Sequence, residues 1–506
     1  MDNSNSNMAE GSAPHVAVVG AGPAGLAAAL AAAARGVRVS LIDSAGEAGG
    51  QFYRQPASAL GARRPHALHH RWRTWERLRD GLAMHVAGGR ITHLTDHHVW
   101  FVERQSAVQS DGFTVHALLG PEQEQSVAVR ADAVLLATGG YEKVLPFPGW
   151  TLPGVVTAGG AQAMLKGGLV LPGRAVVVAG TGPLLMPVAA GLAAAGAEVA
   201  ALVEAADPRT LARHARVLAA HPAKLAEGAW YAAELARRRV RVHVRHTVVA
   251  AHGSERVEAV TVAALDGDGR VRPGTERRTA CDTLAVGHGM LPHTDLAEAL
   301  GCRLDGTDVA VDDEQRTDVP GVWAAGETTG IGGAVLSLAE GRIAGLSIAA
   351  RLNSRTPGAR SYDAAAKARS GLREFFAVLD TVFAPPAHWT EQVTDDTVVC
   401  RCEEVPASAI RQAAGELGAG DVRTVKLLTR AGMGWCQGRM CGPAVAGLAG
   451  CEFQPSRRPF ARPVPLGVLA RAGDADPADD TSDMDDADQT TNDMSSSFDP
   501  TGWDRS

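Results

Sequence analysis

Four cysteines in the last quarter of the chain have the type and spacing of a metal centre. They form two close pairs, C-x-C and C-x4-C, made of Cys400, Cys402, Cys436 and Cys441. Four thiolates suit either a tetrahedral zinc ion or a [2Fe–2S] cluster, and the first pair is tighter than a usual zinc knuckle. The spacing favours the cluster, with zinc and free or disulfide-bonded cysteines as alternatives. The neighbouring glycines and Arg439 are expected to turn N–H groups toward the sulfurs.

The three other cysteines stand apart from this quartet. Cys281 and Cys302 are expected to be ordinary buried thiols, and Cys451 has no assigned role. Seven cysteines, an odd number and unevenly placed, argue against a disulfide framework and for a metal or redox use.

A glycine-rich loop near the amino terminus indicates dinucleotide chemistry. The stretch from Val16 to Asp43 predicts a strand, a loop, an alanine-rich helix and a second strand. The loop matches GxGxxG, whose glycines allow a tight turn, close approach of a pyrophosphate and close helix–strand packing. A membrane helix over 16–34 is the alternative, and the proline and glycine within that run disfavour it. The residues expected to hold the dinucleotide here are Gly20, Gly22, Pro23, Ala24, Gly25 and Asp43.

Three later segments indicate that this dinucleotide is FAD. A loop at 47–54 would run beneath a flavin, a hydrophobic strand at 132–140 ends in Ala-Thr-Gly-Gly, and a short strand before residue 327 ends in Gly-Glu. The last acid lies where the ribityl chain and second phosphate are expected. These segments add Gly50, Gln51, Arg54, Thr138, Gly139, Gly326 and Glu327 to the predicted FAD site.

A second strand–loop–helix–strand unit spans 173–204, with Gly180, Gly182 and Glu204 as its candidate nucleotide residues. Leu185 replaces the third glycine, so the helix must begin differently and the pyrophosphate contact is weakened. An acid at 204 favours an unphosphorylated ribose, in NAD or an adenine nucleotide, over NADP. The alternative is a structural unit without a ligand. A helical stretch at 208–240 is longer than an ordinary crossover and predicts packing against another subunit.

Composition and charge exclude several classes. With 45% hydrophobic and 21% charged residues, the 506-residue chain is an ordinary globular sequence, long enough for two to four domains. Residues 473–506 carry eleven Asp and one Arg, so this tail accounts for −10 and the rest of the chain for +3. The basic residues at 63–79 alternate with apolar ones and predict an amphipathic helix rather than a nucleic-acid site. No signal peptide or integral membrane segment is predicted, and the expected location is the cytoplasm.

These elements predict the following organisation: a disordered amino terminus at 1–14, the first part of an FAD domain at 15–145, an inserted second Rossmann domain at 146–275, the second part of the FAD domain at 276–352, a helical linker at 353–395, the cysteine module at 396–465 and an acidic disordered tail at 473–506. The strand at 281–289 is assigned to the returning FAD domain. A β meander is expected at 83–130. The predicted fold class is α/β, a flavoprotein with two dinucleotide-binding domains plus a small helical iron–sulfur domain.

Six segments together resemble a known family. VAVVGAGPAGLAAA, GGQFYRQ, DAVLLATGGYEKVLPFPGW, VVVAGTGPLLMPVA, VPGVWAAGE and the cysteine module resemble the FAD-binding A (alpha) subunit of bacterial hetero-oligomeric amine dehydrogenases. That group includes opine oxidases, D-hydroxyproline and proline dehydrogenases, and hydrogen cyanide synthase. The resemblance covers about residues 14–465, and the cysteine module is similar to a bacterioferritin-associated-ferredoxin (BFD) type [2Fe–2S] domain. It implies Rossmann domains like those of glutathione and thioredoxin reductases, although the inserted domain has no CxxC.

The resemblance also implies a role and partners. The amine would be oxidised in a β subunit of D-amino-acid-oxidase type, a small ferredoxin-like γ subunit can complete the hetero-oligomer, and the complex can lie at the inner face of the membrane. Some relatives hold ATP in the second Rossmann unit, and FMN can lie between subunits. No general base or nucleophile stands beside the flavin motifs, so no catalytic residue is predicted. Two other hypotheses stay open: an NAD(P)H-dependent flavin reductase that feeds the cluster, and a scaffold protein that uses both Rossmann units structurally.

Overall fold

The computed structural model describes residues 13–107, 110–354, 362–453 and 458–474. The predicted disorder of residues 1–12 and of most of the acidic tail falls outside these ranges. The chain divides into two compact units, residues 1–463 and 464–506. Helix α13 (Leu466–Asp474) belongs to the second unit, and both Rossmann sheets and the cysteine module belong to the first.

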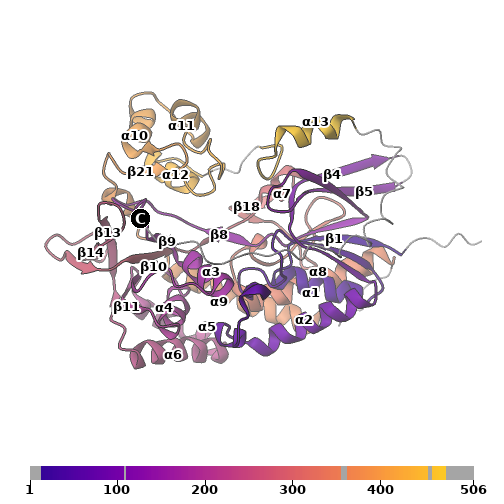
Figure 1. The fold of residues 1–506 in the computed structure, drawn as a ribbon, viewed down its shortest axis with the longest axis horizontal. Coiled ribbons are helices and arrows are strands. Elements are labelled where there is room, and N and C mark those ends of the chain that lie inside the picture. The colour runs from indigo at the N-terminus through magenta and orange to yellow at the C-terminus, as the bar shows by residue number, and fades with distance from the viewer. Residues whose placement is uncertain (1–12, 108–109, 355–361, 454–457, 475–506) are drawn as a thin grey trace, which may run out of the picture. The chain divides into compact units, whose positions relative to one another are not determined.

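The first Rossmann sheet has the strand order β20-β7-β1-β2-β3, and all its pairs are parallel (Figure 1). Side chains alternate along β1 between two cores, as the two-residue period of a strand requires. Val16 and Val18 pack with helices α1, α2 and α8, whereas Ala17 and Val19 pack with an antiparallel meander. The strands are β1 (His15–Val19), β2 (Arg38–Ile42), β3 (Ile91–Leu94), β7 (Ala133–Leu136) and β20 (Val322–Ala324), and the helices are α1 (Pro23–Ala33), α2 (Trp72–Ala87) and α8 (Gly333–Leu352).

The meander begins later than the sequence suggested. Helix α2 continues to Ala87, where Gly88 and Gly89 end it, so residues 83–87 are helical. Strand β3 then joins the Rossmann sheet, and only the next three strands form the meander. These are β4 (His97–Ala107), β5 (Ser110–Leu119) and β6 (Gln125–Ala131).

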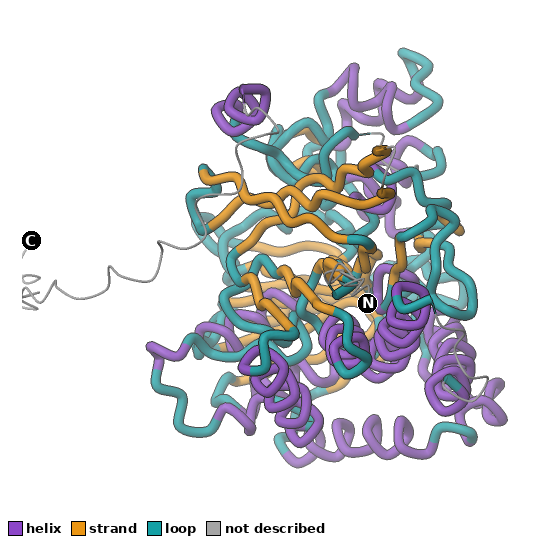
Figure 2. The backbone as a smooth tube through the Cα atoms, turned by 90° about the vertical axis from the view of Figure 1, so that its right-hand side faces the viewer, coloured by secondary structure: helices purple, strands orange, loops and turns teal. Residues whose placement is uncertain are grey.

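The second Rossmann sheet has the order β12-β11-β10-β16-β9, again all parallel. Its strands are β9 (Val155–Thr157), β10 (Ala175–Thr181), β11 (Glu198–Glu204), β12 (Val242–Val244) and β16 (Thr283–His288), and its helices include α3 (Ala158–Gly168) and α4 (Leu185–Ala194). The assignment of 281–289 to the FAD domain is wrong, because β16 pairs with β10 from Val176 to Thr181. The second domain therefore extends past residue 275 to His288. Helices flank the strands in Figure 2.

Two small sheets complete this region. An antiparallel sheet follows β12 and consists of β13 (His246–His252), β14 (Ala259–Ala264) and β15 (Arg277–Ala280). After β16 the chain returns through β17 (Met290–Pro292), which pairs with β8 (Gly140–Glu142), directly after the Ala-Thr-Gly-Gly segment. The returning segment continues through α7 (Asp295–Ala299) and the two-residue strands β18 (Leu304–Asp305) and β19 (Asp308–Val309).

The segment between β11 and β12 is helical and contacts helix α9 (Asp363–Val382). The stretch expected to pack on another subunit forms a 3-10 helix (Pro208–His214), α5 (Ala215–Ala219) and α6 (Pro222–Arg237). Its first two helices contact α9 of the same chain, while Trp230 of α6 remains 54% exposed. The subunit contact itself stays a prediction.

Helix α8 is the only described helix long and apolar enough to cross a membrane by length and composition, with 67% of that window buried in the protein. It lies along α1 (Figure 1) and carries the fully buried Glu340. These features are those of a core helix.

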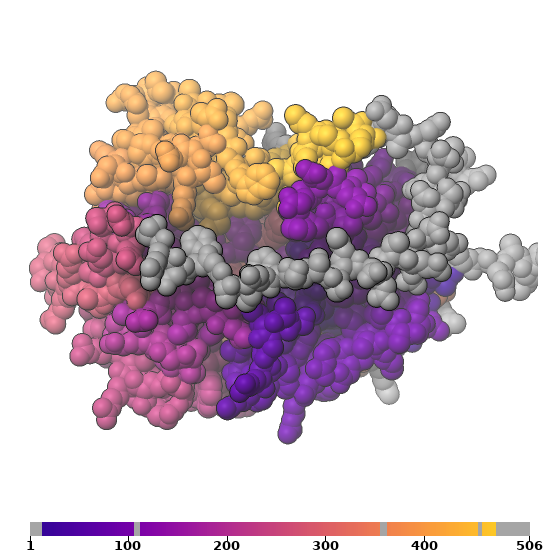
Figure 3. Space-filling view, in the orientation of Figure 1, coloured from indigo at the N-terminus to yellow at the C-terminus, as the bar shows by residue number. Residues whose placement is uncertain are grey.

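The cysteine module is a small helical fold with its own core. It comprises β21 (Val398–Cys400), β22 (Val405–Pro406), α10 (Ala407–Gly415), α11 (Val422–Thr429) and α12 (Gly442–Ala449). The core gathers apolar side chains of all three helices together with Cys400 and Cys441. In Figure 3 the module is the orange lobe.

Candidate functional site

The predicted FAD loop has the geometry of a dinucleotide cradle. A Cβ on Gly20 would lie 2.3 Å from the Ala137 carbonyl oxygen, and one on Gly25 would lie 1.8 Å from the Gly20 oxygen. Both positions therefore need glycine, one between neighbouring strands and one between helix and loop. A Cβ on Gly22, in contrast, would meet only a Gly50 Cα at 3.9 Å. Its open side is where the backbone can be approached by a pyrophosphate.

Helix α1 begins directly after this loop with Pro23 as its first residue and no side-chain cap. Its first N–H groups are therefore available to an anion. Asp43 accepts hydrogen bonds from the N–H groups of Ala21 (2.5 Å) and Ala45 (2.8 Å). The carboxylate thus lies against the loop, at the end of β2 where a ribose is expected.

The other predicted FAD segments converge on this loop. Gly50 packs on Gly22, and a Cβ there would lie 2.8 Å from the Gly22 Cα. Thr328 accepts a hydrogen bond of 3.2 Å from the Gly139 N–H and lies 3.0 Å from the Thr138 hydroxyl. The structure therefore brings together the segments that contain Gly20, Gly50, Gly139 and Gly326.

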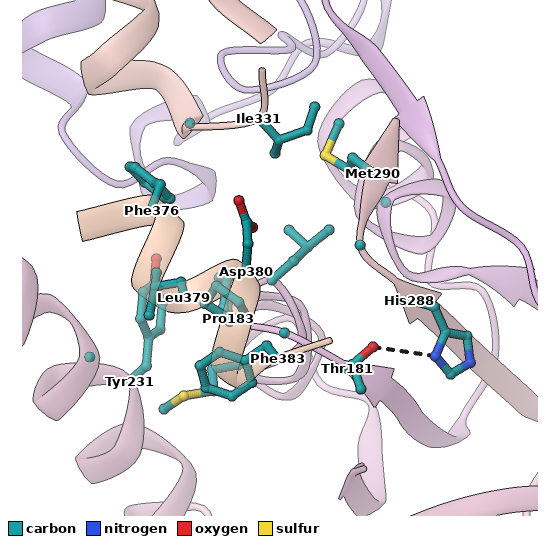
Figure 4. Close-up of a pocket in the computed structure, with 18 of the residues that line it drawn as sticks. Thr181, Pro183, Tyr231, His288, Met290, Ile331, Phe376, Leu379, Asp380 and Phe383 are labelled. Atoms are coloured by element: carbon teal, nitrogen blue, oxygen red, sulfur yellow. Dashed lines mark hydrogen bonds between the residues drawn. The ribbon is translucent and has the colours of Figure 1, made fainter. Parts of the chain in front are cut away.

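One cavity of about 1510 Å³ extends from the FAD segments to the second Rossmann unit. Gln51, Arg54 and Glu327 line one part of it, and Gly182 and Glu204 line another. Burial raises the pKa of Glu327. Helices α6 and α9 supply aromatic walls: Tyr231, Phe376 and Phe383 surround the space into which Asp380 also points, as Figure 4 shows. The cavity thus joins three of the predicted FAD residues to the second nucleotide loop.

The second nucleotide loop differs from the first in the way predicted from Leu185. Helix α4 begins at Leu185, three residues after Gly182, whereas α1 begins one residue after Gly22. Leu185 is buried in the core of the second domain. In the first unit the first turn of the helix follows the second glycine directly. In the second unit the cavity is lined at this place by Pro183, Leu184 and Met186.

Glu204 and His288 are the buried titratable groups of this loop. Glu204 accepts hydrogen bonds from the N–H groups of Gly182 (3.1 Å) and Ala206 (2.9 Å), and burial raises its pKa to about 7. His288 Nδ1 lies 3.4 Å from the Thr181 hydroxyl (dashed in Figure 4). Burial lowers the pKa of His288 to about 4, so its imidazole is neutral at pH 7.

The structure brings the four predicted ligand cysteines together. Thiol contacts link Cys400 to Cys441, Cys441 to Cys436 and Cys436 to Cys402. A Cβ on Gly434 would lie 2.2 Å from the Cys402 Cβ, so glycine is required where the two cysteine loops meet. Among the described side chains, no group of three or more has the arrangement of a bound metal ion. The four thiols form a chain of side-chain contacts instead.

The surroundings lower the pKa of two of the four thiols, Cys400 and Cys436, and raise the pKa of Cys402 and Cys441. Hydrogen bonding from the Cys441 thiol lowers the pKa of Cys400 to about 6 and that of Cys436 to about 5, and the same contacts raise the pKa of Cys441 itself. The Gly432 N–H donates to the Cys400 sulfur at 3.4 Å. Four sulfurs with backbone donors form a donor set suited to a [2Fe–2S] cluster, which takes four thiolates. Cys281 and Cys302 are buried away from the quartet, as predicted.

Arg439 does not turn toward the sulfurs, contrary to the sequence-based expectation. Its Nε donates to Asp295 Oδ2 at 3.0 Å, and its Nη1 donates to the Cys436 carbonyl at 3.3 Å. Asp295 lies in the FAD domain, directly after β17 and His293. This contact between the two modules had no signal in the sequence, because its residues are 144 positions apart.

The sequence also did not predict two other buried ionic groups, Lys166 and Glu340. Lys166 donates to the Phe52 carbonyl at 3.0 Å, and its pKa is lowered to about 8 by burial and by Arg54. Glu340 pairs with Arg373 at 2.6 Å and accepts from the Gly326 N–H at 3.0 Å. Lys166 is the only charged residue of the α3 sequence, and this was the available signal for it; Glu340 shares α8 with Arg342 and Arg351 and had no such signal.

Comparisons with known proteins agree with this geometry. The family model described as "pyridine nucleotide-disulphide oxidoreductase" matches residues 14–351, and that of the "BFD-like [2Fe-2S] binding domain" matches residues 398–449. The fold and the two modules thus define an FAD-dependent oxidoreductase with a carboxyl-terminal [2Fe–2S] domain. The chain belongs to the pyridine nucleotide-disulphide oxidoreductase family.

Individual relatives span most of the chain. Hydrogen cyanide synthase subunit HcnB of Pseudomonas protegens is 35% identical over 447 residues, covering 84% of this chain and 89% of the relative. An opine oxidase subunit from Agrobacterium tumefaciens is 32% identical over 440 residues, covering 85% and 84%. The crystal structure of L-proline dehydrogenase from P. horikoshii has a TM-score of 0.60 at 20% identity and covers 91% and 81%, which shows a shared fold. The predicted family resemblance is confirmed, as are FAD and [2Fe–2S] as cofactors.

Proposed function

We propose that this chain is the electron-transfer subunit of a multisubunit amine dehydrogenase. The carrying observation is that a two-domain flavoprotein fold and a four-cysteine module form one compact unit. Relatives of nearly the same extent are named as subunits of hydrogen cyanide synthase and opine oxidase. A partner subunit would oxidise a C–N bond, and two electrons would leave through this chain to a one-electron acceptor protein.

The cofactors would be held by the residues already described. FAD would be held by the loop from Gly20 to Gly25, by Asp43, by the Gly50–Arg54 segment, and by Thr138, Gly139, Gly326 and Glu327. The four cysteines would hold the cluster. Bound FAD exchanges one or two electrons and the cluster exchanges one, which is the chemistry needed between a two-electron donor and a one-electron acceptor.

The second Rossmann unit supports a role other than hydride transfer. Its helix begins late, and Pro183, Leu184 and Met186 line the space in front of it. We infer that any occupant is an adenine nucleotide, ATP or NAD, whose ribose is held by Glu204. The proposed substrate is an amine such as an opine, a D-amino acid or an imino acid. The proposed partners are a β subunit like D-amino-acid oxidase and a small ferredoxin-like γ subunit, with FMN at the subunit interface. The proposed location of the complex is the cytoplasm.

An NAD(P)H-dependent flavin reductase is the second candidate, since one cavity is lined both by predicted FAD residues, Gln51 and Glu327 among them, and by the second nucleotide loop. Anaerobic mixing of the purified chain with NADH, and separately with NADPH, distinguishes the two. We expect the flavin absorbance to stay unchanged with either nucleotide. Rapid bleaching by one of them would establish the second candidate in place of the first.

The partner subunit is tested by purification. The chain is isolated from its host under mild conditions, and the proteins that come with it are identified by mass spectrometry. We expect a second flavoprotein whose addition allows an amine, such as an opine or an imino acid, to reduce the flavin of this chain. A chain that purifies alone and gains no amine-dependent reduction from any co-expressed neighbour would count against the proposal.

A further inference from the structure

A continuous set of side-chain contacts joins the wall of the FAD cavity to the loop that carries Cys436. Tyr141, on β8, lines the cavity, and its ring meets that of His293 edge-on at 6.2 Å. His293 Nε2 lies 3.0 Å from Asp295 Oδ2, which also accepts from Arg439 Nε at 3.0 Å. Arg439 in turn holds the Cys436 carbonyl through both its backbone N–H (3.1 Å) and its Nη1 (3.3 Å).

The flavin end of this set is fixed by the predicted FAD motif itself. The His293 N–H donates to the Gly139 carbonyl at 2.9 Å, and the Thr138 hydroxyl donates to the His293 carbonyl at 2.6 Å. Two hydrogen bonds therefore attach His293 to the Ala-Thr-Gly-Gly segment, and Asp295 follows two residues later in the chain.

The carboxylate of Asp295 is built to remain charged. Its side chain is only 12% exposed, and burial alone would raise its pKa, but His293 and Arg439 outweigh burial and hold it at about 2. Arg458 adds a longer contact, with its Nη1 3.7 Å from Asp295 Oδ1. Glu298, Tyr141 and Cys436 are further titratable groups that face this junction. Separating the two modules would leave the buried Asp295 carboxylate without the cations of the opposite module. Because an uncompensated buried charge is costly, the ion pair favours one orientation of the modules.

Two further contacts hold the same cysteine loops. The Trp150 Nε1–H, from the second Rossmann domain, donates to the Val398 carbonyl at 2.5 Å, two residues before Cys400. Met440, next to Cys441, packs on the core that includes Trp150 and Phe147. Both loops that bear ligand cysteines are thus bound to the flavoprotein body, and Asp295 supplies the ionic part of that attachment.

We propose that Asp295 is the positioning residue that docks the iron–sulfur module on the FAD domain, so that electrons cross between the two cofactors within one rigid unit. This inference rests on the proposed relay and adds to it the contact by which the relay is held. His293 orients the carboxylate from the flavin side, and Arg439 receives it from the cluster side. Docking by a fixed ion pair favours a constant separation between cofactors over a swinging module.

The test uses the full chain loaded with FAD and iron–sulfur cluster. The flavin is photoreduced anaerobically in a laser flash, and the cluster's reduction is followed by its absorbance and by electron paramagnetic resonance of rapidly frozen samples. We expect Asp295→Asn to slow the transfer about tenfold or more, which corresponds to about 1.4 kcal/mol in the docked population. Iron content and the two reduction potentials, measured by dye-mediated titration, are expected to match the wild type.

Arg430→Gln is the matched control, because it removes an ion pair of similar length to Glu403 (2.9 Å) within the iron–sulfur module. It should leave the transfer rate unchanged. Arg439→Lys keeps the charge but loses the forked geometry, and its rate should lie between those of Asp295→Asn and the wild type. Hydrogen exchange of residues 436–441 should rise in Asp295→Asn and not in the control.

Three outcomes decide the matter. A wild-type protein whose cluster is never reduced by its flavin would overturn the proposed relay itself. A wild type that relays normally and an Asp295→Asn variant that relays at the same rate would overturn only the docking inference. If Asp295→Asn loses its cluster, His293→Gln takes its place: slower transfer with both potentials unchanged supports the inference, and unchanged transfer overturns it.

Discussion

Glu204 occupies in the second Rossmann unit the position that Asp43 occupies in the first. Each carboxylate ends the second strand of its unit and accepts one N–H from the glycine loop and one from two residues further along its own chain. Glu204 is only 5% exposed, and its longer side chain reaches Gly182 where Asp43 reaches Ala21. The second unit therefore retains the acid of a nucleotide site although its third glycine is lost.

The buried Glu204 should make stability depend on pH. Its folded pKa of about 7 lies above the ordinary value of 4.5, so the folded chain binds this proton more tightly than the unfolded chain. Protonation of Glu204 contributes about 3 kcal/mol to the free energy of unfolding. This contribution is complete below pH 4.5 and is lost as the pH rises through 7. We expect Glu204→Gln to remove this fall, as measured by urea unfolding from pH 4.5 to 8. Glu198→Gln, at the exposed start of β11, is the control, and an unchanged pH slope in Glu204→Gln would contradict the expectation.

Substitutions at Gly22 and Gly25 should have different effects, because Gly22 faces the expected ligand and Gly25 packs against the protein backbone. An alanine at position 22 meets no protein atom closer than 3.9 Å, and its φ of −73° suits any residue. Gly22→Ala should therefore fold normally and bind FAD at least about tenfold more weakly, or about 1.4 kcal/mol, because its methyl group occupies the pyrophosphate side. Binding is measured by flavin fluorescence quenching on the apoprotein. Tight FAD binding by Gly22→Ala would show that the pyrophosphate lies elsewhere.

The comparison variant for that experiment is Gly25→Ala. Its Cβ would lie 1.8 Å from the Gly20 carbonyl oxygen, so the loop and helix must separate. We expect it to lower the free energy of unfolding by about 1–3 kcal/mol even in the absence of FAD.

Cys436→Ser should keep FAD and lose the cluster. The FAD segments lie outside the cysteine module, whereas Cys436 contacts both Cys402 and Cys441. The expected readout is a normal flavin spectrum with loss of iron, of acid-labile sulfide and of dye reduction beyond the flavin. Cys281→Ser, at a buried thiol in the core of the second Rossmann domain, should keep all three. Unimpaired electron transfer in Cys436→Ser would exclude a cluster relay.

The sequence was sufficient where a local pattern determines the structure. Both strand–loop–helix–strand units follow their glycines and buried runs closely, and the four cysteines meet because each pair lies on a short loop of one small domain. Pairing partners of a strand are not local. Strand β16 joins β10 rather than β7, and its apolar sequence suits either sheet equally. The domain boundary near residue 275 was wrong for this reason.

Ionic contacts between residues far apart in the chain could not be predicted either, because they too are not determined by a local pattern. Asp295 and Arg439 each look like an ordinary surface residue in the sequence, and only the fold reveals that each has a partner on the other module. Arg439 was expected to serve the sulfurs because it stands between two cysteines. In the fold its guanidinium pairs with the carboxylate of Asp295 instead. The position of Arg439 in the cysteine loop does not reveal this partner.

The Arg373–Glu340 pair should stabilise the FAD domain through helix α9. Glu340 is fully buried in α8, pairs with Arg373 at 2.6 Å and holds the Gly326 N–H at 3.0 Å, beside the predicted FAD residue Glu327. Burial raises the pKa of Glu340 even with the guanidinium beside it. Arg373→Met leaves this carboxyl without its cation and should cost about 3–5 kcal/mol, measured by urea unfolding of the FAD-saturated chain.

Two variants make that result specific. Arg369→Met, on the same helix, breaks a pair with the 96% exposed Asp313 and a hydrogen bond to the buried Gln315 side chain (3.1 Å), and should cost less, about 1–2 kcal/mol. The double variant Arg373→Met with Glu340→Gln removes both charges and should recover most of the lost stability, since the cost lies in the unpaired buried carboxyl rather than in the pair itself. FAD retention on gel filtration should follow the same order, because the side chain of residue 340, as a carboxylate or as an amide, accepts from the Gly326 N–H. A double variant as unstable as Arg373→Met alone would show instead that the packing of the Arg373 side chain, and not its charge, joins α9 to the FAD domain.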